Sequence, residues 1–338
     1  MNREAAMKVA DTVLYEGYML YPYRPSAIKN RQRWSFGILY SADYEEVRQG
    51  TERSQMHSEC LLQLTGNAEV NVQLRFLHLL SKEAFELVDE HLEPVACITA
   101  GGEPMQTWDE GVARSVQFGT AINGNLHQAF NFDFPGTDES ETLRDKDGRV
   151  VGELRRSQDP VQGTITLTCS SISAQLVKLS IDVANTTGLP PYAMDRDSAL
   201  LSSLLSAHTI LAATGGEFVS LLEPADDLRQ YVSTCQNVGN FPVLVGTEGE
   251  RDMMLCSPIV LYDYPQVAPE SAGDFYDATE MDEMLTLRVM TLTDQEKNEM
   301  RMAGERVRNL LERTEASARE QLARTHGIIR NLRPASGE

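Results

Sequence analysis

The sequence predicts an α+β fold, with a β-sandwich-like N-terminal region, a mixed region and a long C-terminal helix. Three observations support this. Apolar and polar residues alternate between Val70 and His78, the period of a half-buried strand. Leucines recur at spacings of three and four within residues 198–214, as in an amphipathic helix. The same spacing, surrounded by Glu and Arg, returns over residues 293–332. We therefore expect a β-rich domain over 1–190, a mixed α/β region over 191–292 and a C-terminal helix and tail over 293–338.

The N-terminal region is predicted from runs of β-favouring residues between turn signals. One or two helical turns over residues 3–10 precede strands over 13–20 and 34–40. The ranges 57–64 and 69–80 form two strands, with a turn at Thr65-Gly66-Asn67, and 82–92 form a short helix. Further strands are expected over 150–156, 163–172 and 174–185, after a β-turn at Lys146-Asp147-Gly148-Arg149. Short strands with regular turns indicate a sandwich or an open barrel.

The second half begins after the boundary marked by Pro190 and Pro191. A helix over 198–214 ends at Gly215-Gly216, and 240–246 and 252–262 form a strand pair. A loop with two prolines then leads into an acidic cluster over 274–283. Thr293 and Glu296 have the spacing of a capping box that opens the final helix.

The charge balance excludes some classes of partner. With 30 Lys and Arg against 50 Asp and Glu, the formal net charge is −20. Nucleic-acid binding requires clustered cations, and anionic membranes repel such a chain, so we expect neither partner. No run approaches the roughly 20 apolar residues of a membrane span, and the start lacks a secretory signal pattern. The expected location is the cytoplasm. The charge has two interpretations. It keeps the protein soluble, or, more specifically, it serves to bind a basic protein partner.

The cysteines and histidines predict neither a metal site nor a cofactor. The five cysteines form no CxxC motif, and only His57 and Cys60 have ligand-like spacing. In a strand these two side chains would point to opposite faces. His78 falls on the apolar face of its strand, which favours a hydrogen-bonded core residue. His208 falls on the leucine stripe, which favours a buried and neutral side chain.

The sequence also lacks the motifs of common enzyme chemistries. It contains no GxSxG nucleophile elbow for a serine triad, and neither a phosphate-binding loop nor GxGxxG. The expected chemistry is therefore recognition without catalysis.

Two blocks carry a resemblance to a known family: VLYEGYMLYPYRPSAIKNRQRW near the start, and residues 256–297. They resemble a conserved family of accessory proteins encoded beside high-affinity, oxygen-tolerant uptake [NiFe]-hydrogenases. Matching blocks lie at 12–40, 204–224 and 256–315 and span most of the chain. The resemblance implies assembly, maturation or attachment of a hydrogenase, and partners among hydrogenase subunits or maturation factors.

Aromatic and charged residues of these blocks are the expected contacts, because Tyr, Trp and Arg are the usual anchors of interfaces. They are Tyr21, Tyr23, Arg24, Lys29, Arg31, Trp34, Tyr262, Tyr264, Asp274, Glu280 and Asp282. The alternative hypothesis is a metal-dependent hydrolase or transferase that uses the acidic cluster at 274–283.

Overall fold

The computed structural model describes residues 3–16, 36–189, 195–266, 292–302, 307–309 and 311–312. The chain divides into two compact units. The first comprises Met1–Tyr18 and Trp34–Val267, and the second comprises Met19–Arg33 and Ala268–Glu338.

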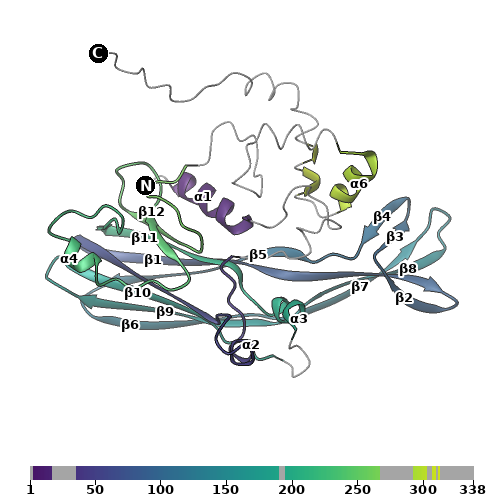
Figure 1. Ribbon diagram of the computed structural model, residues 1–338, viewed down its shortest axis with the longest axis horizontal. Coiled ribbons are helices and arrows are strands. Elements are labelled where there is room, and N and C mark those ends of the chain that lie inside the picture. The colour runs from purple at the N-terminus through teal and green to yellow at the C-terminus, as the bar shows by residue number, and fades with distance from the viewer. Residues whose placement is uncertain are drawn as a thin grey trace, which may run out of the picture. The chain divides into compact units, whose positions relative to one another are not determined.

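The first unit is built on one antiparallel sheet of 11 strands, to which a separate two-stranded ribbon of β3 and β4 is added (Figure 1). Its strands are β1 (Gln55–Val88), β2 (His91–Val95), β3 (Cys97–Ala100), β4 (Glu103–Gln106), β5 (Glu110–Ile122), β6 (Leu126–Phe134), β7 (Thr137–Arg144), β8 (Val150–Gln158), β9 (Val161–Ser171), β10 (Leu176–Asn185), β11 (Leu205–Phe218), β12 (Phe241–Leu244) and β13 (Met253–Ser257). Its helices are α1 (Arg3–Tyr15), α2 (Ala42–Val47), α3 (Arg196–Leu201) and α4 (Arg229–Val232).

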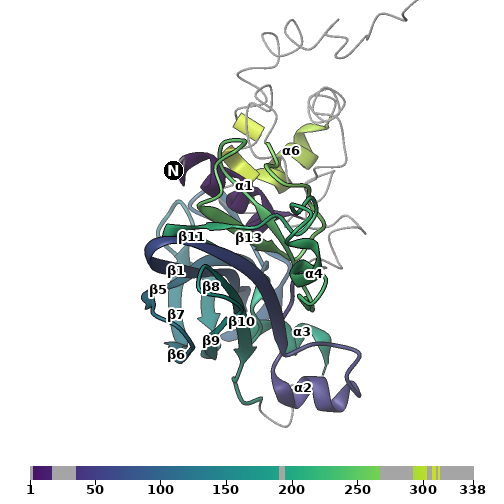
Figure 2. The ribbon, with the colours of Figure 1, turned by 90° about the vertical axis from the view of Figure 1, so that its left-hand side faces the viewer.

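Strand β1 organises the sheet, because its 34 residues pair with different neighbours along its length. The first part pairs with β10 from Gln55 to Gln63. The middle lies between β11 and β5, and the last part pairs with β8 and β2. A register shift between Leu64 and Glu69 bends the strand. Figure 2 shows the sheet curving from β11 and β13 through β1 to β10 and β9.

The main core lies on the concave side of this bend. Alternate residues of β1 such as Val70, Val72 and Leu74 are fully buried, and they join Leu179 and Ile181 of β10 in one cluster. Side chains from β9, β11 and β6 complete the cluster. The period of two that is visible in the sequence thus follows burial on one face of the sheet.

The last part of β1 extends beyond this core into an arm with β2, β3, β4, β7 and β8, at the right-hand end of Figure 1. A separate small cluster of Ala84, Ile98, Ala100, Leu143 and Leu154 holds the arm together.

Helix α1 covers part of the convex face. Its apolar side, with Ala6, Val9 and Val13, packs on Ile210 of β11 and Leu255 of β13. The sheet therefore has apolar residues on both faces under this helix.

The α+β prediction is wrong, because the described residues are mostly strand and form one large antiparallel sheet. Of the predicted fold class, the β-rich character of the N-terminal region is confirmed. The expected helix over 198–214 is the short α3 followed by β11, and the expected helix over 82–92 lies within β1 and β2. The turn at residues 65–67 is part of β1, and the expected strand from Val13 begins within helix α1. Within 34–40, the described residues form only an isolated bridge at Leu39.

In the second unit, the described residues include helix α6 (Asp294–Met302) and helical stretches at 307–309 and 311–312, and the rest of the expected helix over 293–332 lies outside the described residues. The predicted capping box is confirmed: the Thr293 backbone N–H donates to the Glu296 carboxylate at 2.9 Å, and the Glu296 N–H donates to the Thr293 hydroxyl at 3.3 Å. No helix of the described residues is long and apolar enough to span a membrane.

Candidate functional site

The candidate site is an open hollow of about 600 Å³ in the first unit, which we call the rim hollow. It is bounded by the segment before α2, the segment that joins α2 to β1, and the loop before β12. Its lining residues are Phe36, Gly37, Ile38, Leu39, Gly50, Thr51, Glu52, Arg53, Met56, Asn237, Val238, Gly239, Phe241 and Pro258.

Three large apolar side chains of the rim hollow are exposed to solvent. Phe36 is 39% exposed, and Val238 and Phe241 are each 46% exposed. Two residues past Pro258, Val260 is 75% exposed, and Tyr262 is 85% exposed. Single exposed apolar residues are normal on a protein surface, but several around one concavity are typical of an interaction site.

Backbone hydrogen bonds fix the wall formed by residues 36–40. The Leu39 N–H donates to the Leu204 carbonyl at 2.9 Å, and the Ala207 N–H donates to the Gly37 carbonyl at 2.9 Å. Gly37 is needed here, because its φ is +54° and a Cβ would lie 2.7 Å from Pro258 Cβ. The wall is therefore held in place by the protein's own backbone.

A polar network on β1 and β10 fixes the opposite wall, which carries Val238. His57 exchanges two backbone hydrogen bonds with Val238, at 3.0 and 2.8 Å. The His57 side chain lies 2.6 Å from the Asp182 carboxylate. The Gln236 N–H donates to the Glu59 carboxylate at 2.8 Å.

Glu59 is the central acceptor of this network. Burial opposes its ionisation, but hydrogen bonds from the Gln236 backbone and from the Lys178 and Ser180 side chains keep its pKa below the ordinary value. Its own N–H donates to the Asn237 side chain at 2.9 Å. The network positions the rim rather than presenting a reactive group.

Two of the predicted contact residues are described, and they differ in exposure. Tyr262 is exposed to solvent. Tyr264 is half-buried; its hydroxyl donates to the Glu250 carbonyl at 2.9 Å and its N–H to the Leu244 carbonyl at 2.7 Å. The others, Tyr21, Tyr23, Arg24, Lys29, Arg31, Trp34, Asp274, Glu280 and Asp282, lie outside the described residues, as does the acidic cluster at 274–283.

Sequence reasoning missed Phe36, Val238 and Phe241. Phe36 and Phe241 were included in expected strands, where an apolar residue predicts burial. Only the fold brings residues near 36, 53, 238 and 258 together, through the Leu39–Leu204 and His57–Val238 bridges.

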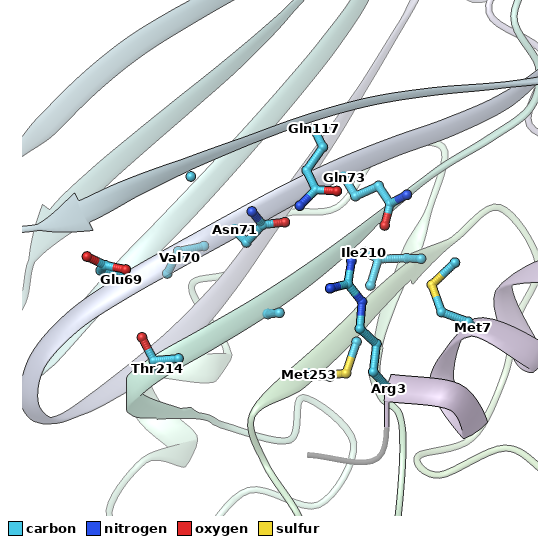
Figure 3. A pocket seen from close by; sticks show the side chains of 12 residues that line it. Arg3, Met7, Glu69, Val70, Asn71, Gln73, Gln117, Ile210, Thr214 and Met253 are labelled. Carbon is cyan, nitrogen blue, oxygen red and sulfur yellow. The ribbon is translucent and has the colours of Figure 1, made fainter.

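A second and smaller cavity of about 220 Å³ lies between α1 and the convex face of the sheet (Figure 3). Arg3 and Met7 project from α1 toward it, and Asn71, Gln73 and Gln117 line it from β1 and β5. Amide side chains can donate and accept hydrogen bonds, but they supply neither a nucleophile nor a strong base.

An ion pair lies farther along the contact between α1 and the sheet. Arg75, two residues past Gln73, is 9% exposed and forms a short contact with Asp11 of α1. His208 stands opposite Arg75 in the β1–β11 register and is fully buried. Burial lowers the pKa of His208 to about 4, so the ring is neutral at pH 7 and adds no like charge beside Arg75.

The remaining histidine predictions are confirmed. His57 and Cys60 point to opposite faces of β1, since His57 meets Asp182 outside and Cys60 is fully buried in the core. His78 is buried, and its Nε2 lies 2.9 Å from the Asp159 carbonyl. Within the described residues, no three His, Cys, Asp or Glu side chains are grouped as metal ligands would be.

No protein-family model matches the chain. No curated protein matches it either.

Proposed function

We propose that this chain is a non-catalytic accessory protein that acts through protein–protein contacts, with the rim hollow as one contact surface. The observation that carries the proposal is the gathering of Phe36, Val238 and Phe241, all exposed, around one concavity with fixed walls. These side chains are already more than half buried, so covering the remainder against a partner contributes about 1 kcal/mol each. Fixed walls reduce the entropy lost on binding.

We further propose that the partner is a subunit or maturation factor of a [NiFe]-hydrogenase. This part is supported by the sequence resemblance at 12–40, 204–224 and 256–315, two blocks of which include residues of the rim hollow or Tyr262. Tyr262 extends the apolar surface, and its hydroxyl supplies a polar handle of the kind enriched in interfaces.

The test is capture of hydrogenase proteins by tagged full-length protein from cells that make the enzyme. The wild type should recover a hydrogenase subunit or maturation factor, and the double variant Phe241→Ser/Tyr262→Ser should lose at least tenfold of it. Leu87→Ser and Val150→Ser are the matched controls, because these side chains are 39% and 40% exposed but lie on the arm. They should recover the wild-type amount.

Two results would end the proposal. Failure of the wild type to recover any hydrogenase protein would remove the partner, and equal recovery by all variants would remove the rim hollow as the contact. Thermal unfolding of each variant shows whether loss of capture reflects loss of folding. Recovery of the mature enzyme in fixed stoichiometry would identify a permanent subunit, whereas recovery with precursors alone would identify an assembly factor.

A further inference from the structure

The free edges of the sheet differ in how they are protected from pairing with another strand. At β12, Pro242 has no N–H to donate, and the backbone of Leu244 is bonded to Asp263 and Tyr264. At β7, the exposed Asp138, Glu139 and Glu141 place charge along the strand. At β2, exposed Glu93 and Pro94 have the same effect. Proline and charge are the usual devices against edge-to-edge association.

Between Ala113 and Ala121, strand β5 has no proline, and its one charged residue, Arg114, lies on the side that faces the core. Among the described strands it pairs with β1 alone, and its register runs from Glu110 to Ile122 without a shift. The exposed residues of its convex side are uncharged: Ala113, Ser115, Gln117, Gly119 and Ala121. A long, regular and neutral edge favours the addition of a strand.

The other side of β5 is already packed. Val116 and Phe118 pack against the main core, and the Phe118 ring stacks on Phe130 of β6 with centroids 3.6 Å apart. Arg114, the charged residue of this side, donates to Gln158 at 3.0 Å and lies over the Phe134 ring. A strand that pairs with β5 would therefore find the core side of β5 already packed. The charge of Arg114 is already in contact with Gln158 and Phe134.

We propose that the occupant of this edge is a second copy of the chain, paired antiparallel with β5 through Ala113–Ala121 of each copy. A strand that pairs with itself in this way generates a two-fold dimer in which both copies use the same surface. In any such register, the residues that meet on the convex side are small or neutral, so no like charges face each other. This matters because each copy carries a net charge of −20.

The neutral edge itself offers a charged occupant no counter-charge to pair with, whereas a second copy brings an equally neutral edge. Two acidic copies repel at long range, so the dimer should be stronger at physiological ionic strength than at low salt. An interface driven by a basic partner would weaken with salt instead. The sign of the salt dependence therefore separates the two kinds of occupant.

The test uses sedimentation and light scattering of the full-length protein with paired charge variants. Ser115→Lys/Gln117→Lys and Ser115→Glu/Gln117→Glu should each raise the dimer dissociation constant by roughly tenfold or more, because like charges then face each other across the interface. When the two variants are mixed, opposite charges meet, and the heterodimer should form. The neutral variant Ser115→Thr/Gln117→Thr should remain dimeric.

The mixing step separates a specific effect from damage to the fold, since damaged chains would not regain association. It also accounts for the hydrogen bond from Gln73 to the Ser115 hydroxyl, because both charge variants lose this bond and the Thr variant keeps a hydroxyl there. A monomeric wild type, dimeric charge variants, or charge variants that stay monomeric when mixed would each overturn the proposal. None of these results bears on hydrogenase capture through the rim hollow.

Discussion

Arg75 shows how one side chain links a helix to the sheet. It is almost fully buried in β1, and Asp11 of α1 supplies its counter-charge. A buried cation without a partner is costly, so the ion pair specifies where α1 docks. The neutral His208 ring beside it completes the arrangement without a second positive charge.

We expect Asp11→Asn to lower the free energy of unfolding by about 1–2 kcal/mol. Breaking a buried pair costs more, but the Asp11 side chain is 46% exposed and solvent screens part of the interaction. Glu4→Gln on the same helix is the control, because Glu4 and Lys8 of the Glu4–Lys8 pair are 81% and 68% exposed and the pair should contribute less than about 0.5 kcal/mol. Urea unfolding measures both, and equal effects would contradict the role given to Arg75.

The buried histidines predict a loss of stability on acidification. The pKa values of His78 and His208 are both lowered from 6.5 to about 4, chiefly by burial. Between these values the unfolded chain binds more protons than the folded one, so stability falls as pH drops from 6.5 toward 4. Between pH 7 and pH 5 the expected loss is about 2 kcal/mol for each histidine.

Urea unfolding across this pH range measures the slope. His78→Gln and His208→Gln should each remove about half of the histidine contribution, and the double variant should remove nearly all of it. Comparing slopes rather than absolute stabilities allows for the packing that each substitution disturbs. Unchanged slopes in both single variants would show that neither histidine titrates in this range.

At the scale of elements, β11 shows why the sequence predicted a helix. Its residues from Leu205 to Ala213 are buried almost without interruption, because the main core lies on one face and α1 on the other. A strand buried on both faces has no alternation, so its leucines match helical spacing equally well. Ser206 has a positive φ of 51°, and a register shift lies beside it, so the strand contains a β-bulge. The spacing of apolar residues in the sequence cannot reveal such a bulge.

The features that could be predicted are those formed by residues close together in the sequence. The capping box at Thr293 and the turn at Gly148, where the Gly148 N–H donates to the Asp145 carbonyl at 3.1 Å, depend on neighbours in sequence. The pairing of 240–246 with 252–262 is confirmed in β12 and β13 for the same reason. The rim hollow is formed by segments that are distant in sequence. Of the exposed residues in and near it, only Tyr262 was therefore predicted from the sequence.

The arm offers a test of close packing between strands. A Cβ on Gly152 would lie 2.0 Å from the Phe85 carbonyl oxygen and 2.7 Å from Ile98 Cδ1. We expect Gly152→Ala to destabilise the arm by about 2–3 kcal/mol, since backbone must move to admit the methyl group. Gly66→Ala, with no atom within 4 Å of its Cβ, should be close to neutral. Hydrogen exchange of β7 and β8 would register the difference, and equal protection in the two variants would contradict it.

At the scale of the whole molecule, charge is distributed unevenly along the chain. From Thr293 to the end, nine Lys and Arg face eight Asp and Glu, which leaves 21 against 42 in the rest. Some of this repulsion is concentrated at the arm, where Glu86 and Glu93 stand directly opposite each other on β1 and β2. Like charges in opposite positions of a ladder destabilise it.

Self-repulsion of this size predicts that salt stabilises the folded chain. Moving from low to physiological ionic strength should raise the free energy of unfolding by roughly 1 kcal/mol, because screening weakens repulsion between exposed carboxylates. Glu93→Lys should raise stability by about 0.5–1 kcal/mol at low salt, since it replaces a repulsive pair with an attractive one. The stability gained by Glu93→Lys should shrink as salt is added. Glu93→Gln should gain about half as much stability as Glu93→Lys at low salt.

Thermal unfolding at several sodium chloride concentrations measures the stability of the wild type and of both variants. A wild type whose stability falls with added salt would show that attractive ion pairs, such as Arg156–Glu141 and Lys82–Glu110, outweigh the repulsion of the excess acid.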